Sequence, residues 1–86
     1  MRFTFCKKLR LSELTGFSNS TFKRLRKRGD WIEGIHYQTI NSRTIVYVPE
    51  LCLDYFRNQD NPEAHQRLIE EYLKSKDNNL LDPSTV

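Results

Sequence analysis

The chain has 86 residues, of which 29% are charged and 12% aromatic, and its formal net charge is +3. A chain of this length has room for one small domain, and the composition is that of a folded chain, not a disordered one. No run of apolar residues is long enough to span a membrane and no signal peptide is visible at residues 1–3, so we expect a cytoplasmic protein, in a host cell if it is viral.

The charge is divided unevenly along the chain. Residues 1–48 hold ten Lys or Arg against three Asp or Glu, whereas residues 49–86 hold four against eight. The net charge is therefore +7 in the first part and −4 in the second. This asymmetry predicts that the first part binds a polyanion and that the second part does not.

Residues 11–29 predict two short helices joined by a tight turn. Gly16 suits the end of the first helix and Ser18 the N-cap of the second. Helical spacing assigns to one small core the apolar residues Leu11, Leu14, Phe17, Phe22 and Leu25. This pattern is typical of a helix-turn-helix, whose second helix normally enters the major groove of DNA.

The second predicted helix, which ends at Gly29, is strongly basic. When Phe22 and Leu25 face inward, the opposite face carries Ser20, Lys23, Arg24 and Lys27, and the flanks carry Arg26 and Arg28. No acidic residue lies on this face, although like charges at this spacing repel one another. Phosphate is the obvious counter-charge, and a solvated basic helix is the alternative.

Residues 36–40 and 44–48 predict a β-hairpin with Asn41, Ser42 and Arg43 at its tip. Tyr37, Ile45 and Tyr47 are expected on the face packed against the helices, and Trp31 is expected to anchor the base. A hairpin that follows a helix-turn-helix is a wing, and Arg43 at the tip suits a narrow minor groove. The alternative is that Asn41, Ser42 and Arg43 serve only to form the turn.

Two further helices are predicted after the hairpin. Pro49 suits the first position of a short helix, which residues 58–61 break. Asn61 as cap and Pro62 as first residue begin a last amphipathic helix. Its apolar stripe, which either packs on the domain or meets a second chain, consists of Ala64, Leu68, Ile69, Tyr72 and Leu73. We expect a domain at 1–58, this helix at 59–76 and a flexible tail at 77–86.

Neither a metal site nor an enzyme active site is indicated. Cys6 and Cys52 lack the paired spacing of a zinc site or a disulfide framework, and we expect both to be reduced and packed. His36 and His65 add no ligand pattern. We predict no cofactor and no catalysis, since no nucleophile–base pair or phosphate-cradling glycine loop is present.

Two segments resemble a known family. Residues 11–25, with Leu11, Leu14, Thr15-Gly16-Phe17-Ser18, Thr21-Phe22 and Leu25, resemble the start of MerR-type and excisionase-type winged-helix domains. Gly34-Ile35-His36-Tyr37 and Arg43-Thr44-Ile45-x-Tyr47 resemble the wing of small excisionase-like proteins of phages and mobile elements. The resemblance covers residues 6–57. It implies a mainly α winged helix-turn-helix with a small β-hairpin, here followed by a C-terminal amphipathic helix.

The family's role implies double-stranded DNA as the partner. The residues expected to contact DNA are Asn19, Ser20, Lys23, Arg24, Lys27, Arg28, Asn41, Ser42 and Arg43. The long dimerising helix and the effector site of MerR-type regulators are not visible in the sequence, which favours an architectural DNA binder. A nucleoid-associated, DNA-bending excisionase-like factor that works with an integrase or recombinase is the first hypothesis. A small transcriptional repressor and a phage packaging or replication accessory module are the alternatives, and self-association on DNA or through the last helix stays open.

Overall fold

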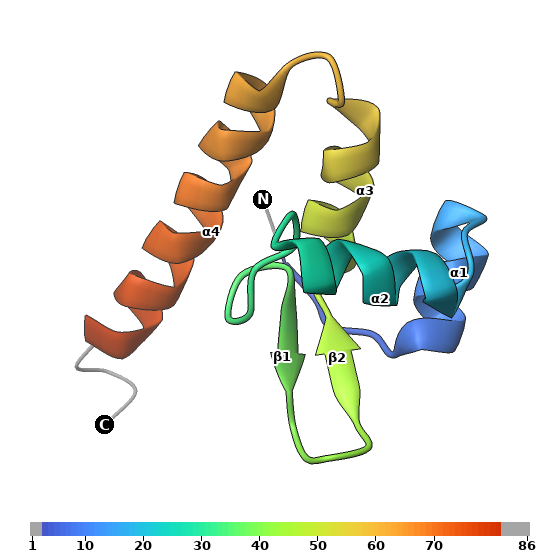
Figure 1. The fold of residues 1–86 in the computed structure, drawn as a ribbon. Coiled ribbons are helices and arrows are strands. Elements are labelled where there is room, and N and C mark those ends of the chain that lie inside the picture. Colours follow the sequence, from blue (N-terminus) through green and yellow to red (C-terminus); the bar gives the residue numbers. More distant parts are fainter. Residues whose placement is uncertain (1–2, 82–86) are drawn as a thin grey trace.

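The computed structural model describes residues 3–81, which form a small, mainly helical domain with a two-stranded antiparallel hairpin (Figure 1). The hairpin projects away from the helices, and the C-terminal helix lies along another side of the molecule (Figure 1). The elements in chain order are α1 (Lys8–Thr15), α2 (Asn19–Arg28), β1 (Tyr37–Thr39), β2 (Ile45–Tyr47), α3 (Pro49–Arg57) and α4 (Pro62–Leu81).

The turn between α1 and α2 forms where the sequence predicts it. Gly16 ends α1 with φ 79° and Gly29 ends α2 with φ 84°, both in the left-handed region that glycine enters without strain. Ser18 is the N-cap residue of α2, but its side chain makes no capping hydrogen bond. Its backbone carbonyl accepts hydrogen bonds from the amides of Thr21 and Phe22 instead.

The first core cluster joins α1, α2, the hairpin and α3. Trp31 is 1% exposed, and its ring lies near those of Phe22, His36, Tyr47, Tyr55 and Phe56. The buried members of the cluster are Leu11, Phe22, Leu25, Trp31, Tyr47 and Cys52. The prediction that Trp31 belongs to the core at the base of the hairpin is confirmed.

Two residues assigned to this core are exposed and not buried. Leu14 is 39% and Phe17 43% exposed, so their assignment was wrong. Leu14 lies about 60° around the short α1 from Leu11, which is the buried residue of that helix. Phe17 lies beyond the end of α1, where helical spacing no longer applies, and its ring stacks on Phe56 with centroids 4.5 Å apart.

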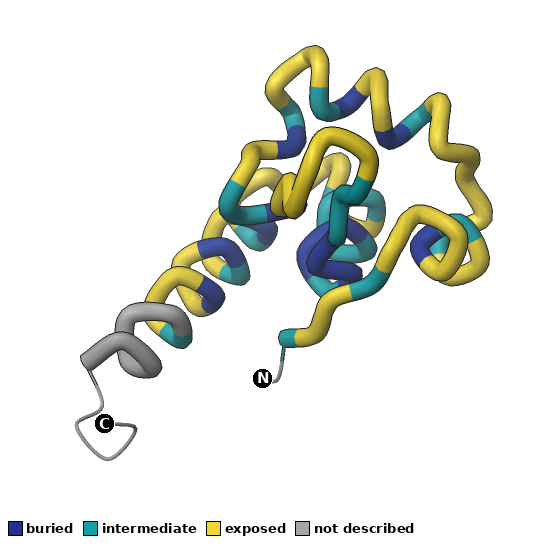
Figure 2. The backbone as a smooth tube through the Cα atoms, turned by 90° about the horizontal axis from the view of Figure 1, so that it is seen from below, coloured by how far each residue is buried: buried dark blue, intermediate teal, exposed yellow. Residues whose placement is uncertain are grey.

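The hairpin has the predicted inward face but shorter strands than expected. Tyr37 pairs with Tyr47 and Thr39 with Ile45. Tyr47 belongs to the first core cluster, and Tyr37 and Ile45 pack against it. Ile40 lies outside the strand and is 58% exposed. Residues 38–43, from β1 to the hairpin tip, are exposed (Figure 2).

The second core cluster holds α4 against the rest of the domain. Val48, Leu51, Ile69 and Tyr72 are buried there, with Leu68 packed alongside. Asn61 caps α4 as predicted, since its Oδ1 accepts a hydrogen bond from the Ala64 amide at 3.3 Å. Leu73, which was predicted to belong to the apolar stripe of this helix, is 39% exposed. Packing of α4 on its own domain is the arrangement that the structure shows.

The end of α4 differs from the expectation. The helix continues to Leu81, beyond the predicted end at 76, because no glycine interrupts the sequence and the next proline is Pro83. Of the expected tail at 77–86, residues 77–81 are helical and residues 82–86 lie outside the described part.

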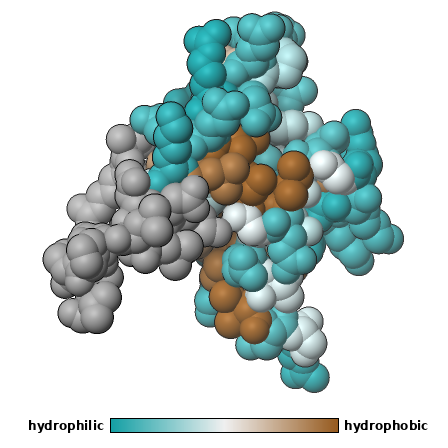
Figure 3. All heavy atoms as spheres, turned by 90° about the vertical axis from the view of Figure 1, so that its left-hand side faces the viewer, coloured by the Kyte–Doolittle hydropathy of each residue, from teal (hydrophilic) through white to brown (hydrophobic). Residues whose placement is uncertain are grey.

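The described side chains include exposed apolar ones and two free cysteines. The face seen in Figure 3 carries apolar side chains between hydrophilic areas. Cys6 and Cys52 form no disulfide, as expected, and burial raises the pKa of the Cys52 thiol, which therefore stays protonated within the core. Within residues 3–81, no helix has both the length and the apolar character needed to cross a bilayer.

Candidate nucleic-acid interface

Helix α2 presents a cationic surface without any acidic residue in the helix itself. Phe22 and Leu25 are its buried residues and hold it on the core. The side chains predicted to face outward, Ser20, Lys23, Arg24 and Lys27, are all exposed. Arg28 forms an ion pair with Asp30 at 3.1 Å, so part of its charge is compensated within the protein.

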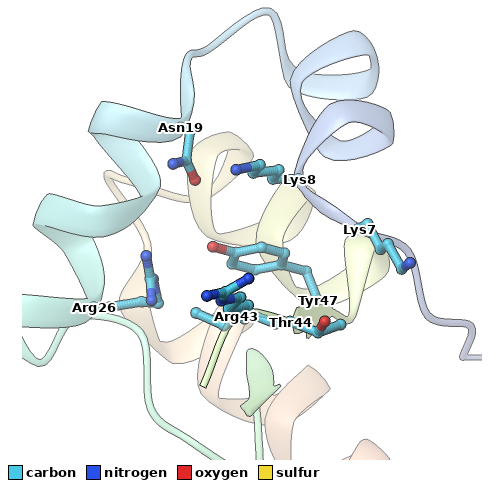
Figure 4. A pocket seen from close by; sticks show the side chains of 8 residues that line it. Lys7, Lys8, Asn19, Arg26, Arg43, Thr44 and Tyr47 are labelled. Atoms are coloured by element: carbon cyan, nitrogen blue, oxygen red, sulfur yellow. The ribbon is translucent and has the colours of Figure 1, made fainter. Parts of the chain in front are cut away.

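A pocket of about 220 Å³ lies between α2, the hairpin and the start of α1. Four of its lining residues are cations and none is acidic; they are Lys7, Lys8, Asn19, Arg26, Arg43, Thr44, Ile45 and Tyr47. Figure 4 shows Lys8, Asn19, Arg26 and Arg43 around Tyr47, whereas the Lys7 side chain points to the outer side. Cations from three separate elements thus converge on one hollow.

Arg26 is the least solvated cation of this pocket. It is half-buried, and its guanidinium carbon lies 5.7 Å from the centroid of the Tyr37 ring. Its Nε atom is buried and has no hydrogen-bond partner. A buried donor without a partner is costly, and an anion in the pocket would supply both an acceptor and a counter-charge.

Tyr47 forms the floor of the pocket. It is 1% exposed and pairs with Tyr37 across the hairpin. Its amide donates to the Cys6 carbonyl at 2.7 Å, which ties the hairpin to the chain just before α1. Burial raises the pKa of the Tyr47 phenol, and nearby Arg26 opposes that rise. The phenol therefore stays neutral and adds no negative charge to the cationic pocket.

The hairpin tip combines turn formation with a directed cation. Asn41 Oδ1 accepts hydrogen bonds from the amides of Arg43 and Thr44, both at 2.9 Å, so this side chain stabilises the turn. Ser42 and Arg43 are exposed. The Arg43 side chain lines the pocket beside α2 (Figure 4), although the sequence indicated only its place at the tip.

The predicted site residues of α2 lie on more than one surface. Asn19 lines the pocket beside the hairpin. Arg24 and Arg28 line a different, more open groove on the side of α3, together with Thr21, Leu25, Phe17, Tyr55, Phe56 and Gln59. By helix geometry, Ser20, Lys23 and Lys27 lie between these two sides. The predicted residues of α2 therefore lie on one broad surface of the helix, which extends from the pocket beside the hairpin to the groove beside α3.

Sequence reasoning missed several residues of the pocket, namely Lys7, Lys8, Arg26, Thr44, Ile45 and Tyr47. Arg26 was placed on the flank of α2, and Lys7 and Lys8 lie at the start of α1. In the sequence, only the positive charge of these cations indicated a role in binding, since no periodicity relates residues 7–8 to residue 26 or 43.

The described residues contain no cluster of three or more His, Cys, Asp or Glu side chains that could hold a metal ion. Comparison of the chain with protein-family models, with curated proteins and with solved structures finds no match.

Proposed function

We propose that this protein binds double-stranded DNA as a winged helix-turn-helix, with α2 in the major groove and the hairpin as the wing. The observation that carries the proposal is the acid-free pocket in which Lys8, Arg26 and Arg43 converge from α1, α2 and the hairpin. A DNA strand that passes between the recognition helix and the wing would place a phosphate at this pocket.

The remaining cations of α2 support the same orientation. Lys23 and Lys27 are exposed beside Ser20 on the face turned away from the core. This α-helix of ten residues is about 15 Å long, and the major groove admits such a helix. Arg24 is the candidate to read a guanine edge, and Lys27 the candidate to contact phosphate.

The narrower role that we propose is that of an excisionase-like, DNA-bending recombination factor. It rests on the sequence resemblance of residues 6–57 and on analogy. Binding to several adjacent sites with bending of the DNA would support this role. A single palindromic operator would favour a transcriptional repressor, and the lack of sequence-specific DNA binding would favour a packaging or replication accessory module.

Salt dependence is the first test of the DNA-binding proposal. We expect affinity for duplex DNA to fall steeply with salt, with a log–log slope of about −0.9 for each phosphate contacted, because bound cations release counterions. Three contacts through the pocket would give a slope of about −2.7. Fluorescence anisotropy with a labelled duplex measures it, and an unchanged affinity between low and physiological salt would contradict the proposal.

A further inference from the structure

Two histidines and an aspartate form a hydrogen-bonded relay between α3, α4 and the base of the hairpin. His36 Nε2 lies 2.8 Å from His65 Nε2, and His65 Nδ1 lies 2.9 Å from Asp54 Oδ2. Asp54 Oδ1 accepts a further hydrogen bond from the Asn58 side-chain amide at 2.8 Å. We call Asp54, His65 and His36 the histidine relay. His36 is 1% and His65 9% exposed.

The contacts of the relay fix where each proton lies. The Ile32 amide donates to His36 Nδ1 at 3.1 Å, so this nitrogen must carry a lone pair and neutral His36 carries its proton on Nε2. His36 Nε2 then donates to His65 Nε2, which leaves the proton of His65 on Nδ1, where it is donated to Asp54. Each ring is neutral and is held in one tautomer.

An additional proton has no compatible position on either imidazole ring in this arrangement. If it binds His65 Nε2, two N–H groups face each other across 2.8 Å. If it binds His36 Nδ1 instead, that N–H faces the Ile32 amide. Either position replaces a hydrogen bond with two opposed donors, so protonation must separate His36 from one of its partners.

His36 connects the relay to the hairpin and to α2. Its backbone carbonyl accepts from the Val48 amide at 2.9 Å, which joins the residue before β1 to the residue after β2. Its ring stacks on Trp31, with centroids 6.1 Å apart and planes at 8°, and Trp31 stacks on Phe22 of α2. The position of the His36 ring thus bears on the hairpin and on α2 together.

Burial and the neighbouring imidazole favour the neutral form of His36. Burial, and then the neighbouring His65, lower the pKa of His36 to about 4 from 6.5. Cys52 donates to the His36 carbonyl from α3, where the Tyr55 ring also lies against both imidazoles. The carboxylate of the relay, Asp54, contacts His65 and not His36. Because the native chain binds a proton at His36 less readily than the unfolded chain, its stability falls as the pH is lowered from 6.5 toward 4.

We propose that the histidine relay is a proton-sensitive contact through which α4 positions the hairpin, so that acidification loosens the hairpin from α2 and α4. The expected effect of the relay on DNA binding rests on the proposed function, whereas the expected effect of the relay on the hairpin does not. His36 and His65 are then positioning residues, because they act on the DNA-contacting elements through packing and touch no ligand themselves.

The test is a pH titration of the free, isotope-labelled protein by NMR, from about pH 7.5 to about pH 3.5, because the pKa of His36 is lowered to about 4. Backbone amides of residues 37–39 and 45–47 report on the hairpin, and those of residues 14–17 serve as the internal reference. The control variant is His65→Gln, because a glutamine amide oxygen can accept from His36 Nε2 but does not titrate. Ring nitrogen shifts of the wild-type protein give the two tautomers directly and keep the proposal testable if the variant does not fold.

We expect the hairpin amides of the wild-type protein to shift far more than the reference amides, and those of the variant to shift less, because only the clash between His36 Nδ1 and the Ile32 amide remains. The tautomers expected near neutral pH are Nε2–H for His36 and Nδ1–H for His65. Hairpin shifts no larger than the reference shifts, an equal pH response of the variant, or other tautomers would overturn the proposal.

A parallel titration with duplex DNA separates the two proposals. We expect the wild-type affinity to fall several-fold over the same pH interval and the affinity of His65→Gln to change less. A hairpin response without any DNA binding would overturn the proposed function and support the relay. DNA binding with an unresponsive hairpin would overturn the relay and support the function.

Discussion

Replacing Trp31 with alanine is expected to destabilise the domain by about 3–5 kcal/mol, the usual cost of truncating a buried aromatic residue. Small domains have a free energy of unfolding of about 5–15 kcal/mol, so the variant should be close to unfolded. The reason is its position, since the ring packs between Phe22 of α2, Tyr47 of the hairpin and Phe56 of α3. Urea denaturation followed by circular dichroism measures the loss.

The matched control for Trp31→Ala is Ile32→Ala. Ile32 is the next residue and is 48% exposed, so we expect its change to stay within about 0.5 kcal/mol, as for most surface positions. If the two variants unfold at similar urea concentrations, Trp31 is not the centre of the core that the structure shows.

The combined variant Arg26→Ala, Arg43→Ala is expected to weaken DNA binding by about tenfold to a hundredfold, because each removed cation eliminates a charge-assisted hydrogen bond to phosphate. The slope of affinity against salt should become shallower by about 2, one for each phosphate that is no longer neutralised. Anisotropy titrations at several salt concentrations measure both effects. Circular dichroism of the variant checks that the fold stays intact without the packing of Arg26 on the Tyr37 ring.

Arg67→Ala is the matched control for charge. Arg67 is an exposed cation on α4, outside the pocket, and its removal lowers the net charge in the same way as either pocket substitution. We expect its affinity to stay close to that of the wild type. An equal loss for each charge removed, irrespective of position, would mean that net charge and not the pocket determines binding.

The sequence was sufficient to place the helices and the hairpin, because their signals are local. Gly16, Gly29, Pro49 and Pro62 mark helix boundaries by their backbone preferences, and the structure has boundaries at those residues. The exposure of Leu14 could not be predicted, because on so short a helix the spacing fits more than one inward face. The end of α4 was predicted too early. The polar residues after position 76 were interpreted as a tail, although none of them is a residue that ends a helix.

The candidate site was only partly predictable. The exposed cations of α2 follow from helical periodicity, which fixes their direction once Phe22 and Leu25 are buried. The pocket depends instead on how the hairpin folds back beside α2, which brings Arg43 next to Arg26. The histidine relay joins His36 to His65, 29 residues apart, and no local pattern relates them.

NMR mapping of a duplex DNA titration tests the central claim most directly. With a short duplex of mixed sequence at low salt, we expect the largest amide shifts in α2, at residues 41–44 of the hairpin and at residues 7–8, which surround the cationic pocket. Residues 66–74 of α4 should be nearly unaffected, because the net charge of residues 49–86 is negative. Shifts centred on α4, or no shifts at saturating DNA, would contradict the proposed DNA-binding surface.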